Sequence, residues 1–104
     1  MAALLIVRAI VPEADRTAFD SWYETEHLPQ AKAAFNALSA RRGWSEQDPG
    51  VHIALYEFET LAQASEIADS AQISQLIAEF DRMWENRVTR TREVLNLKQS
   101  IGLS

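Results

Sequence analysis

Residues 3–11 read ALLIVRAIV and residues 51–59 read VHIALYEFE, and these two stretches decide the fold. Each is a short run rich in branched or aromatic side chains. Pro12 ends the first run, and the turn sequence DPG at 48–50 precedes the second. Such bounded runs are typical of buried β-strands. Both runs carry apolar residues at odd and even positions, so we expect both faces of these strands to be apolar.

Helices are expected between the strands. Apolar side chains recur at helical spacing from Pro12 to His27, and Pro29 disfavours helical geometry at Leu28. The first helix should therefore end or kink near 27–28, with the segment QAKAAFNA able to add a further turn. Thr60 can cap a helical stretch over LAQASEIAD, and Ser70 can cap a second amphipathic helix. The apolar positions of that helix are Ile73, Leu76, Ile77, Phe80, Met83 and Trp84.

The order of these elements predicts the fold class. Weaker strands over 38–47 and roughly 88–99 complete a βαββαβ order. This is the α+β, ferredoxin-like arrangement, with a four-stranded antiparallel sheet and two helices on one face. No repeat, low-complexity tract or linker interrupts the sequence, so we expect a single domain over residues 1–104.

The apolar character of both strand faces predicts a homodimer. Two helices can cover only one face of a four-stranded sheet. An exposed apolar sheet of this size would be unusual on a soluble monomer. Sheet-to-sheet packing of two identical chains would bury the second face, and two-fold dimers are the commonest oligomers.

The composition is that of an ordinary globular protein, with 47% hydrophobic and 24% charged residues. Fifteen acidic against ten basic residues disfavour nucleic acid as a partner. No apolar run approaches the roughly 20 residues that cross a membrane, and the apolar opening is interpreted as a strand rather than a signal peptide. The absence of cysteine excludes disulfides and thiolate metal sites and favours a cytoplasmic location.

The stretch WYETEHLP at 22–29 is the candidate site. His27 has the chemistry for acid–base catalysis, because imidazole titrates near neutral pH. Glu26 falls near the centre of the apolar arc of the helix, where burial would raise the pKa of its carboxyl group. A direct Glu26–His27 pair is not expected, since adjacent residues do not face each other on a helix. The alternative is structural: His27 would interact with the helix dipole, and Glu26 would pair with a strand arginine.

Three aromatic residues, Trp22, Tyr23 and Trp84, have the spacing of core positions and are expected to pack in the core, although they could also wall a pocket. Arg8 interrupts an otherwise apolar strand face, and a buried arginine needs an anionic partner. That partner could be an anionic ligand or a structural glutamate, the candidates being Glu26, Glu57 and Glu59. Neither paired metal-ligand spacing nor a glycine-rich phosphate loop is present.

The sequence resembles the dimeric α+β barrel proteins, particularly the small EthD-like and stress-responsive relatives. Three stretches carry the resemblance: FDSWYETEHLPQ at 19–30, LSARRGW at 38–44 and FDRMWENRVTRTREVL at 80–95. The relatives commonly have a Pro-Gly-aromatic junction before the second strand, where this chain has FNA at 35–37. In some EthD-like decarboxylases and cyclases, the histidine at the end of the first helix is placed for acid–base work. Only His27 matches that position.

Two functions are consistent with these features. In the first, a pocket between the first helix and the sheet binds an aromatic or polyketide-like carbonyl compound. His27 would then act as general acid or base in an isomerisation, cyclisation or decarboxylation, and no cofactor is predicted. In the second, the chain is a non-catalytic homodimeric module, stress-related or ligand-binding, that holds an apolar compound or merely assembles.

Overall fold

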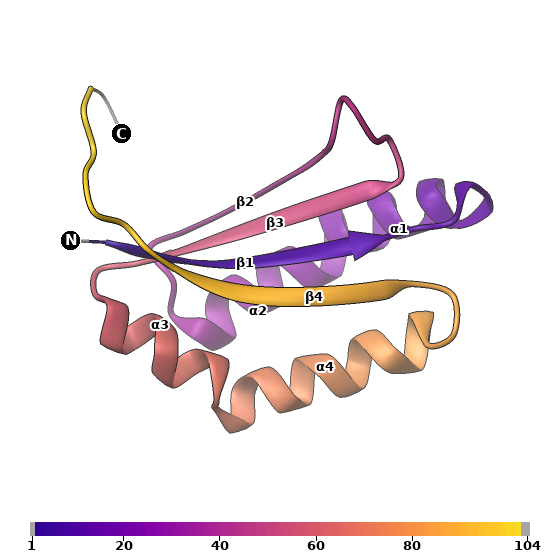
Figure 1. Ribbon diagram of the computed structural model, residues 1–104. Helices are drawn as coiled ribbons and strands as arrows, with labels where there is room; N and C mark the ends of the chain where they lie inside the picture. Colours follow the sequence, from indigo (N-terminus) through magenta and orange to yellow (C-terminus); the bar gives the residue numbers. More distant parts are fainter. Residues whose placement is uncertain (1, 103–104) are drawn as a thin grey trace.

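The computed structural model describes residues 2–102 and confirms the predicted fold class. Four antiparallel strands form one sheet in the order β2-β3-β1-β4, and the helices cover one of its faces (Figure 1). The strands are β1 (Ala3–Ile10), β2 (Ser39–Trp44), β3 (Val51–Phe58) and β4 (Thr89–Asn96). The helical segments are η1 (Glu13–Asp15), α1 (Arg16–Trp22), η2 (Tyr23–His27), α2 (Leu28–Phe35), α3 (Leu61–Ala68) and α4 (Ala71–Trp84).

The strand register determines which side chains face the helices. Val7 of β1 is paired with Ala54 of β3 and with Arg92 of β4, so these three positions share the helix-facing side. Side chains alternate between the two faces along each strand, so four residues of β3 also point into the core. All four are buried: His52, Ala54, Tyr56 and Phe58. The intervening residues of β3 face the opposite, outer side of the sheet and are half-buried.

The first helical region does not end near residues 27–28, because η2 is a π-helix that joins α1 to α2. Its buried positions recur every four residues; they are Phe19, Tyr23, His27, Ala31 and Phe35. An α-helix has about 3.6 residues per turn, so a four-residue repeat would drift about 40° around the helix at each step. The wider π turn takes up this drift. Pro29 lies in the first turn of α2, where its missing N–H is tolerated.

Both predicted caps are present at the start of the second helical region. The side chain of Thr60 accepts a hydrogen bond from the backbone N–H of Gln63, and the side-chain oxygen of Gln63 accepts one from the backbone N–H of Thr60, which makes a capping box before α3. The hydroxyl of Ser70 accepts from the N–H of Ile73 before α4. None of the helices within residues 2–102 is long and apolar enough to span a membrane.

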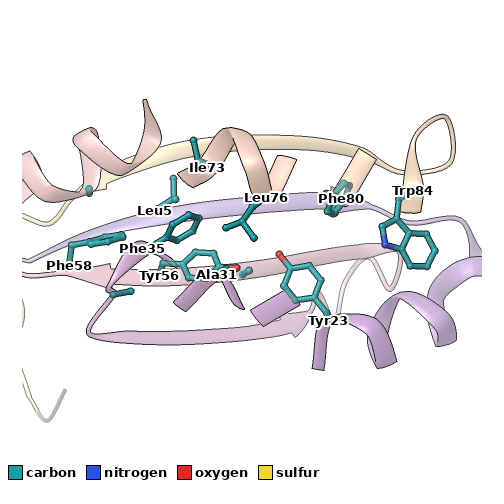
Figure 2. Close-up of a cluster of buried hydrophobic side chains, with 14 of the residues drawn as sticks. Leu5, Tyr23, Ala31, Phe35, Tyr56, Phe58, Ile73, Leu76, Phe80 and Trp84 are labelled. Carbon is teal, nitrogen blue, oxygen red and sulfur yellow. The ribbon is translucent and has the colours of Figure 1, made fainter. Parts of the chain in front are cut away.

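The core lies between the sheet and the helices (Figure 2). Trp84, at the end of α4, is only 2% exposed, as its place in the apolar stripe predicts. Its ring centroid lies 5.3 Å from that of Phe19 and 5.8 Å from that of Trp22. The indole therefore ties α4 to α1 and closes one end of the core.

We expect Trp84→Ala to lower the free energy of unfolding by about 3–5 kcal/mol, because it removes a buried indole and leaves a cavity. Met83→Ala is the matched control, since Met83 is its neighbour on α4 and is 43% exposed. Urea unfolding followed by circular dichroism measures both. Equal effects of the two substitutions would show that Trp84 does not hold the helices together.

Candidate functional site

A small cavity lies between the helix-facing side of the sheet and the segments η2, α2 and α4. Its volume is about 30 Å³. Apolar side chains from β1, α2 and α4 make most of the wall. The remaining lining residues are polar or charged, namely Tyr23, His27, Tyr56, Arg90 and Arg92. No carboxylate is among the lining residues, so the full charges on the lining are those of Arg90 and Arg92.

His27 reaches this cavity from the last position of the π-helix. The imidazole is 6% exposed and stacks on Trp22, with ring centroids 4.4 Å apart and an interplanar angle of 17°. The ring of Tyr23 meets it edge-on at 4.8 Å. The Nδ1 atom of His27 is buried and has no hydrogen-bond partner. Burial, with a smaller contribution from the charge of Arg90, lowers the pKa of His27 from 6.5 to about 4. His27 is therefore neutral at pH 7.

Two tyrosines face the same cavity from η2 and β3. The hydroxyl of Tyr23 points toward the side chain of Tyr56 (Figure 2). Burial raises the pKa of both phenols, and a side-chain hydrogen bond between the two partly opposes this for Tyr23. Both groups therefore stay protonated at neutral pH and can donate hydrogen bonds.

Arg90 and Arg92 lie on the helix-facing side of β4, opposite Ala9 and Val7 of β1. The guanidinium carbon of Arg90 is 4.0 Å from the ring centroid of Phe80, and its Nη2 atom is 3.4 Å from a carboxylate oxygen of Asp81. Burial lowers the pKa of Arg90, Asp81 opposes this effect, and Arg92 adds to it by repulsion. Arg90 is half-buried and Arg92 is exposed, so the two mark the mouth of the cavity.

A second polar cluster lies next to the cavity and involves the other histidine. Asp20 accepts hydrogen bonds of 2.8 Å from both Arg42 and the indole N–H of Trp44. Arg42 also lies 3.2 Å from Nε2 of His52. Because arginine can only donate, Nε2 accepts, and the hydrogen of the neutral ring sits on Nδ1, which is buried without a partner. Burial, and then the charge of Arg42, lowers the pKa of His52 from 6.5 to about 4.

The structure brings some of the predicted site residues together. Tyr23 and His27 line the cavity, and Trp22 contacts it indirectly by stacking on His27. Trp84 is a core residue outside the lining.

The predicted burial of Glu26 is wrong, because its side chain is exposed. It borders a separate surface groove beside Gln30 and Arg82. The π turn explains the error. The prediction assumed α-helical spacing throughout, whereas the four-residue repeat places His27 toward the core and leaves Glu26 on the outside.

Arg8 was expected to be buried, and this is also wrong for the single chain, where its side chain is 48% exposed. It lies on the outer face of the sheet and pairs with Glu93 of β4 at 2.5 Å. None of the glutamates named as candidate partners makes this contact. Arg8 and His27 lie on opposite sides of the sheet, so Arg8 does not belong to the cavity.

Sequence reasoning missed Tyr56, Arg90, Arg92 and His52. The alternation of side chains between the two faces of each strand could have identified them. Val88, Arg90, Arg92 and Val94 occupy one face of the last strand, so two arginines stand where core-facing apolar residues are expected. In the same way, His52 and Tyr56 share the core-facing side of the strand at 51–58.

Within residues 2–102, no three histidine or carboxylate side chains come together as a metal site. No family model matches the sequence, and no curated protein is similar enough in sequence to be matched.

Solved structures do share the fold. A Deinococcus radiodurans protein, provisionally described as an antibiotic biosynthesis monooxygenase, has a TM-score of 0.71 at 10% identity over 98% of each chain. An EthD family protein from Bacillus halodurans C-125 has a TM-score of 0.67 at 14% identity, over 89% of this chain and 97% of its own. SnoaB, a cofactor-independent oxygenase from Streptomyces nogalater, has a TM-score of 0.65 at 10% identity over 96% of each chain. The chain thus has the ferredoxin-like α+β fold that EthD-family and antibiotic biosynthesis monooxygenase proteins share, as the resemblance predicted.

Proposed function

We propose that this chain is a small-molecule enzyme in which neutral His27 acts as the general base. The observation that carries the proposal is the Nδ1 atom of His27, which is buried without a partner on a residue that lines a cavity. Buried polar atoms are nearly always hydrogen-bonded, so an orphan ring nitrogen at a cavity is suited to a ligand. The lowered pKa of His27 keeps the ring in its basic form at neutral pH.

The substrate we propose is an aromatic or polyketide-like carbonyl compound. His27 takes a proton from the carbon next to the carbonyl group, and the electron pair of the broken C–H bond moves to the carbonyl oxygen. The resulting enolate is stabilised by the positive charge of Arg90 and by the hydroxyl groups of Tyr23 and Tyr56. Imidazolium then returns the proton to another carbon, which completes an isomerisation. Alternatively, the enolate carbon attacks a second carbonyl group, the electron pair of that C=O bond moves to its oxygen, and imidazolium protonates the resulting alkoxide, which closes a ring and restores neutral His27.

The neutral state of His27 favours these two reactions over decarboxylation, in which a resting imidazolium would have to supply a proton. The fold itself is compatible with chemistry that needs no cofactor, since SnoaB, which shares it, is described as a cofactor-independent oxygenase. We accordingly propose that no cofactor takes part here either.

A non-catalytic ligand-binding module is the second candidate. The observation that favours a non-catalytic role is the size of the cavity, about 30 Å³, which holds about one or two water molecules. A ring-sized compound would therefore enter only as the lining side chains move apart, and without one the chain would merely assemble. In that case His27 and the two tyrosines would have only a structural role in the core, and any compound that binds would be released without reaction.

Deuterium exchange in D₂O, followed by proton NMR, separates the two candidates. Phenylpyruvate and phenylacetone are suitable probes, because both carry an acidic CH₂ between an aromatic ring and a carbonyl group. We expect the protein to accelerate the exchange of that CH₂ group in at least one of the probes. His27→Gln should reduce the protein-catalysed rate by about 10²–10⁴-fold, the usual loss on removal of a general base.

Glu26→Gln is the control for that substitution, because Glu26 is the exposed neighbour of His27 and lies outside the cavity. It should keep the full rate. Exchange no faster than in buffer, or exchange that survives His27→Gln, would refute the catalytic proposal and leave the binding module.

We also propose that a second copy of the chain covers the outer face of the sheet. Its central residues are apolar, and Ile10 is 60% exposed in the single chain. The charges on this face are paired with each other, Arg8 with Glu93 and Arg41 with Glu57. Gly43 leaves a hollow of about 320 Å³, which Ile53 and Leu55 also line. An apolar face with neutralised charges and a hollow is suited to interlock with a copy of itself.

Light scattering at micromolar concentration should give the mass of two chains. Ile53→Lys should convert the dimer to a folded monomer, because it places a charge in the middle of the outer face. Met83→Lys, on the exposed side of α4, is the control and should stay dimeric. A wild-type mass of one chain, with cooperative unfolding intact, would disprove the dimer.

The stability of the fold should fall as the pH drops from 7 to 5. His27 and His52 both have pKa values lowered from 6.5 to about 4. Between these values, the unfolded chain binds two protons that the folded chain excludes, so acid favours unfolding. We expect a loss of about 2 kcal/mol per histidine between pH 7 and 5.

Urea unfolding at several pH values measures this loss. The variants His27→Gln and His52→Gln should each remove roughly one half of the pH dependence. A free energy of unfolding that does not change from pH 7 to 5 would show that the histidines are not held neutral.

A further inference from the structure

We propose that the ligand of this cavity is an aromatic carboxylate, with its negative charge on Arg90 and Arg92 and its ring directed inward toward His27. The inference rests on the proposed function for the location of the site and adds the charge and orientation of the substrate. The inference follows from the charges around the cavity, where the two arginines have too few carboxylate partners.

The two arginines are short of anionic partners. Within residues 2–102, no carboxylate forms an ion pair with Arg92, and Arg90 has one contact, at 3.4 Å to Asp81. A guanidinium group has five N–H donors, so most donors of this pair remain free. The two side chains also lie on the same side of β4, two residues apart, and their charges repel each other.

The other ion-paired arginines have closer anionic partners. Arg8, Arg41, Arg42 and Arg87 each meet a carboxylate oxygen at 3.1 Å or less, and none of them lines the cavity. The chain as a whole is acidic, with fifteen Asp and Glu residues against ten Lys and Arg. The hollow on the outer face is also lined by two arginines, but Arg41 and Arg42 are each paired with a carboxylate. The cavity beside His27 differs because Arg92 forms no ion pair within residues 2–102 and the one contact of Arg90 is long, which matches an anionic ligand.

The depth of each lining residue sets the orientation. Arg92 is exposed and Arg90 half-buried, whereas Tyr23, His27 and Tyr56 are buried. An anion entering from solvent thus meets the arginines first. A carboxylate suits them because its two oxygens match the fork of a guanidinium group. The interior wall is apolar, with Phe80 and Leu76 among its side chains. Because the cavity measures only about 30 Å³, a flat ring enters it as these side chains move apart.

Binding of phenylacetate and phenylacetamide tests the proposal, because the two have nearly the same shape and differ in charge. Titration of ¹⁵N-labelled protein by NMR gives both dissociation constants, and the shifts of the His27 ring report where the compound sits. We expect phenylacetate to bind at least about tenfold more tightly than phenylacetamide and to shift the His27 signals.

Arg92→Gln should remove most of this preference for the anion. Because Arg92 is exposed, the variant is expected to fold, which its NMR spectrum verifies directly. Arg82→Gln removes the same charge from an exposed position on α4 outside the cavity, so the preference should remain. Arg90→Lys keeps a charge at the mouth but loses the guanidinium fork, and should weaken phenylacetate binding more than phenylacetamide binding.

Equal affinity for the two compounds, a preference that survives Arg92→Gln, or no binding of either would overturn the proposal. So would binding of phenylacetate without any shift of the His27 signals. The proposed function fails by a different observation, namely that neither carbonyl probe exchanges faster with protein present. Tight phenylacetate binding without catalysed exchange would leave an anion-binding cavity without an acid–base role.

Discussion

The fit of one helical region to the sheet is the constraint on which the rest of the structure depends. Phe19, Tyr23, His27, Ala31 and Phe35 all reach the core, and an α-helix cannot hold a four-residue repeat on one side over that length. The π turn at Tyr23–His27 resolves the conflict. As a consequence, His27 is removed from water and its pKa falls to about 4. The local geometry of the helix thus sets the chemistry of the candidate site.

Much of this fold could be predicted from the sequence. The apolar runs identified β1 and β3, Ser70 and Thr60 marked the starts of α4 and α3, and the order of elements led to the sheet topology. These features depend on residues close together in the chain. The side of the helix that carries Glu26 could not be predicted in the same way, because the choice between an α and a π turn depends on packing against the sheet.

The partners of charged residues were harder to predict for a related reason. Arg8 pairs with Glu93, a residue from the far end of the chain that strand order brings alongside. Arg90 and Arg92 were not among the predicted site residues, although their alternation with valines places them on the core side of β4. Candidate sites in this fold are therefore better sought after the register is assigned, by asking which polar residues share the helix-facing side.

The two faces of the sheet differ in how their charges are balanced, and this difference is the reason that assembly is proposed for one face and catalysis for the other. On the outer face, the pairs Arg8–Glu93 and Arg41–Glu57 leave little net charge to oppose burial by another surface. On the helix-facing side, Arg90 disfavours protonation of His27. An anion held by Arg90 and Arg92 would offset that repulsion and strengthen His27 as a base. Neutral His27 would then accept a proton most readily when an anionic substrate is in place, so the basicity of His27 would depend on whether the site is occupied.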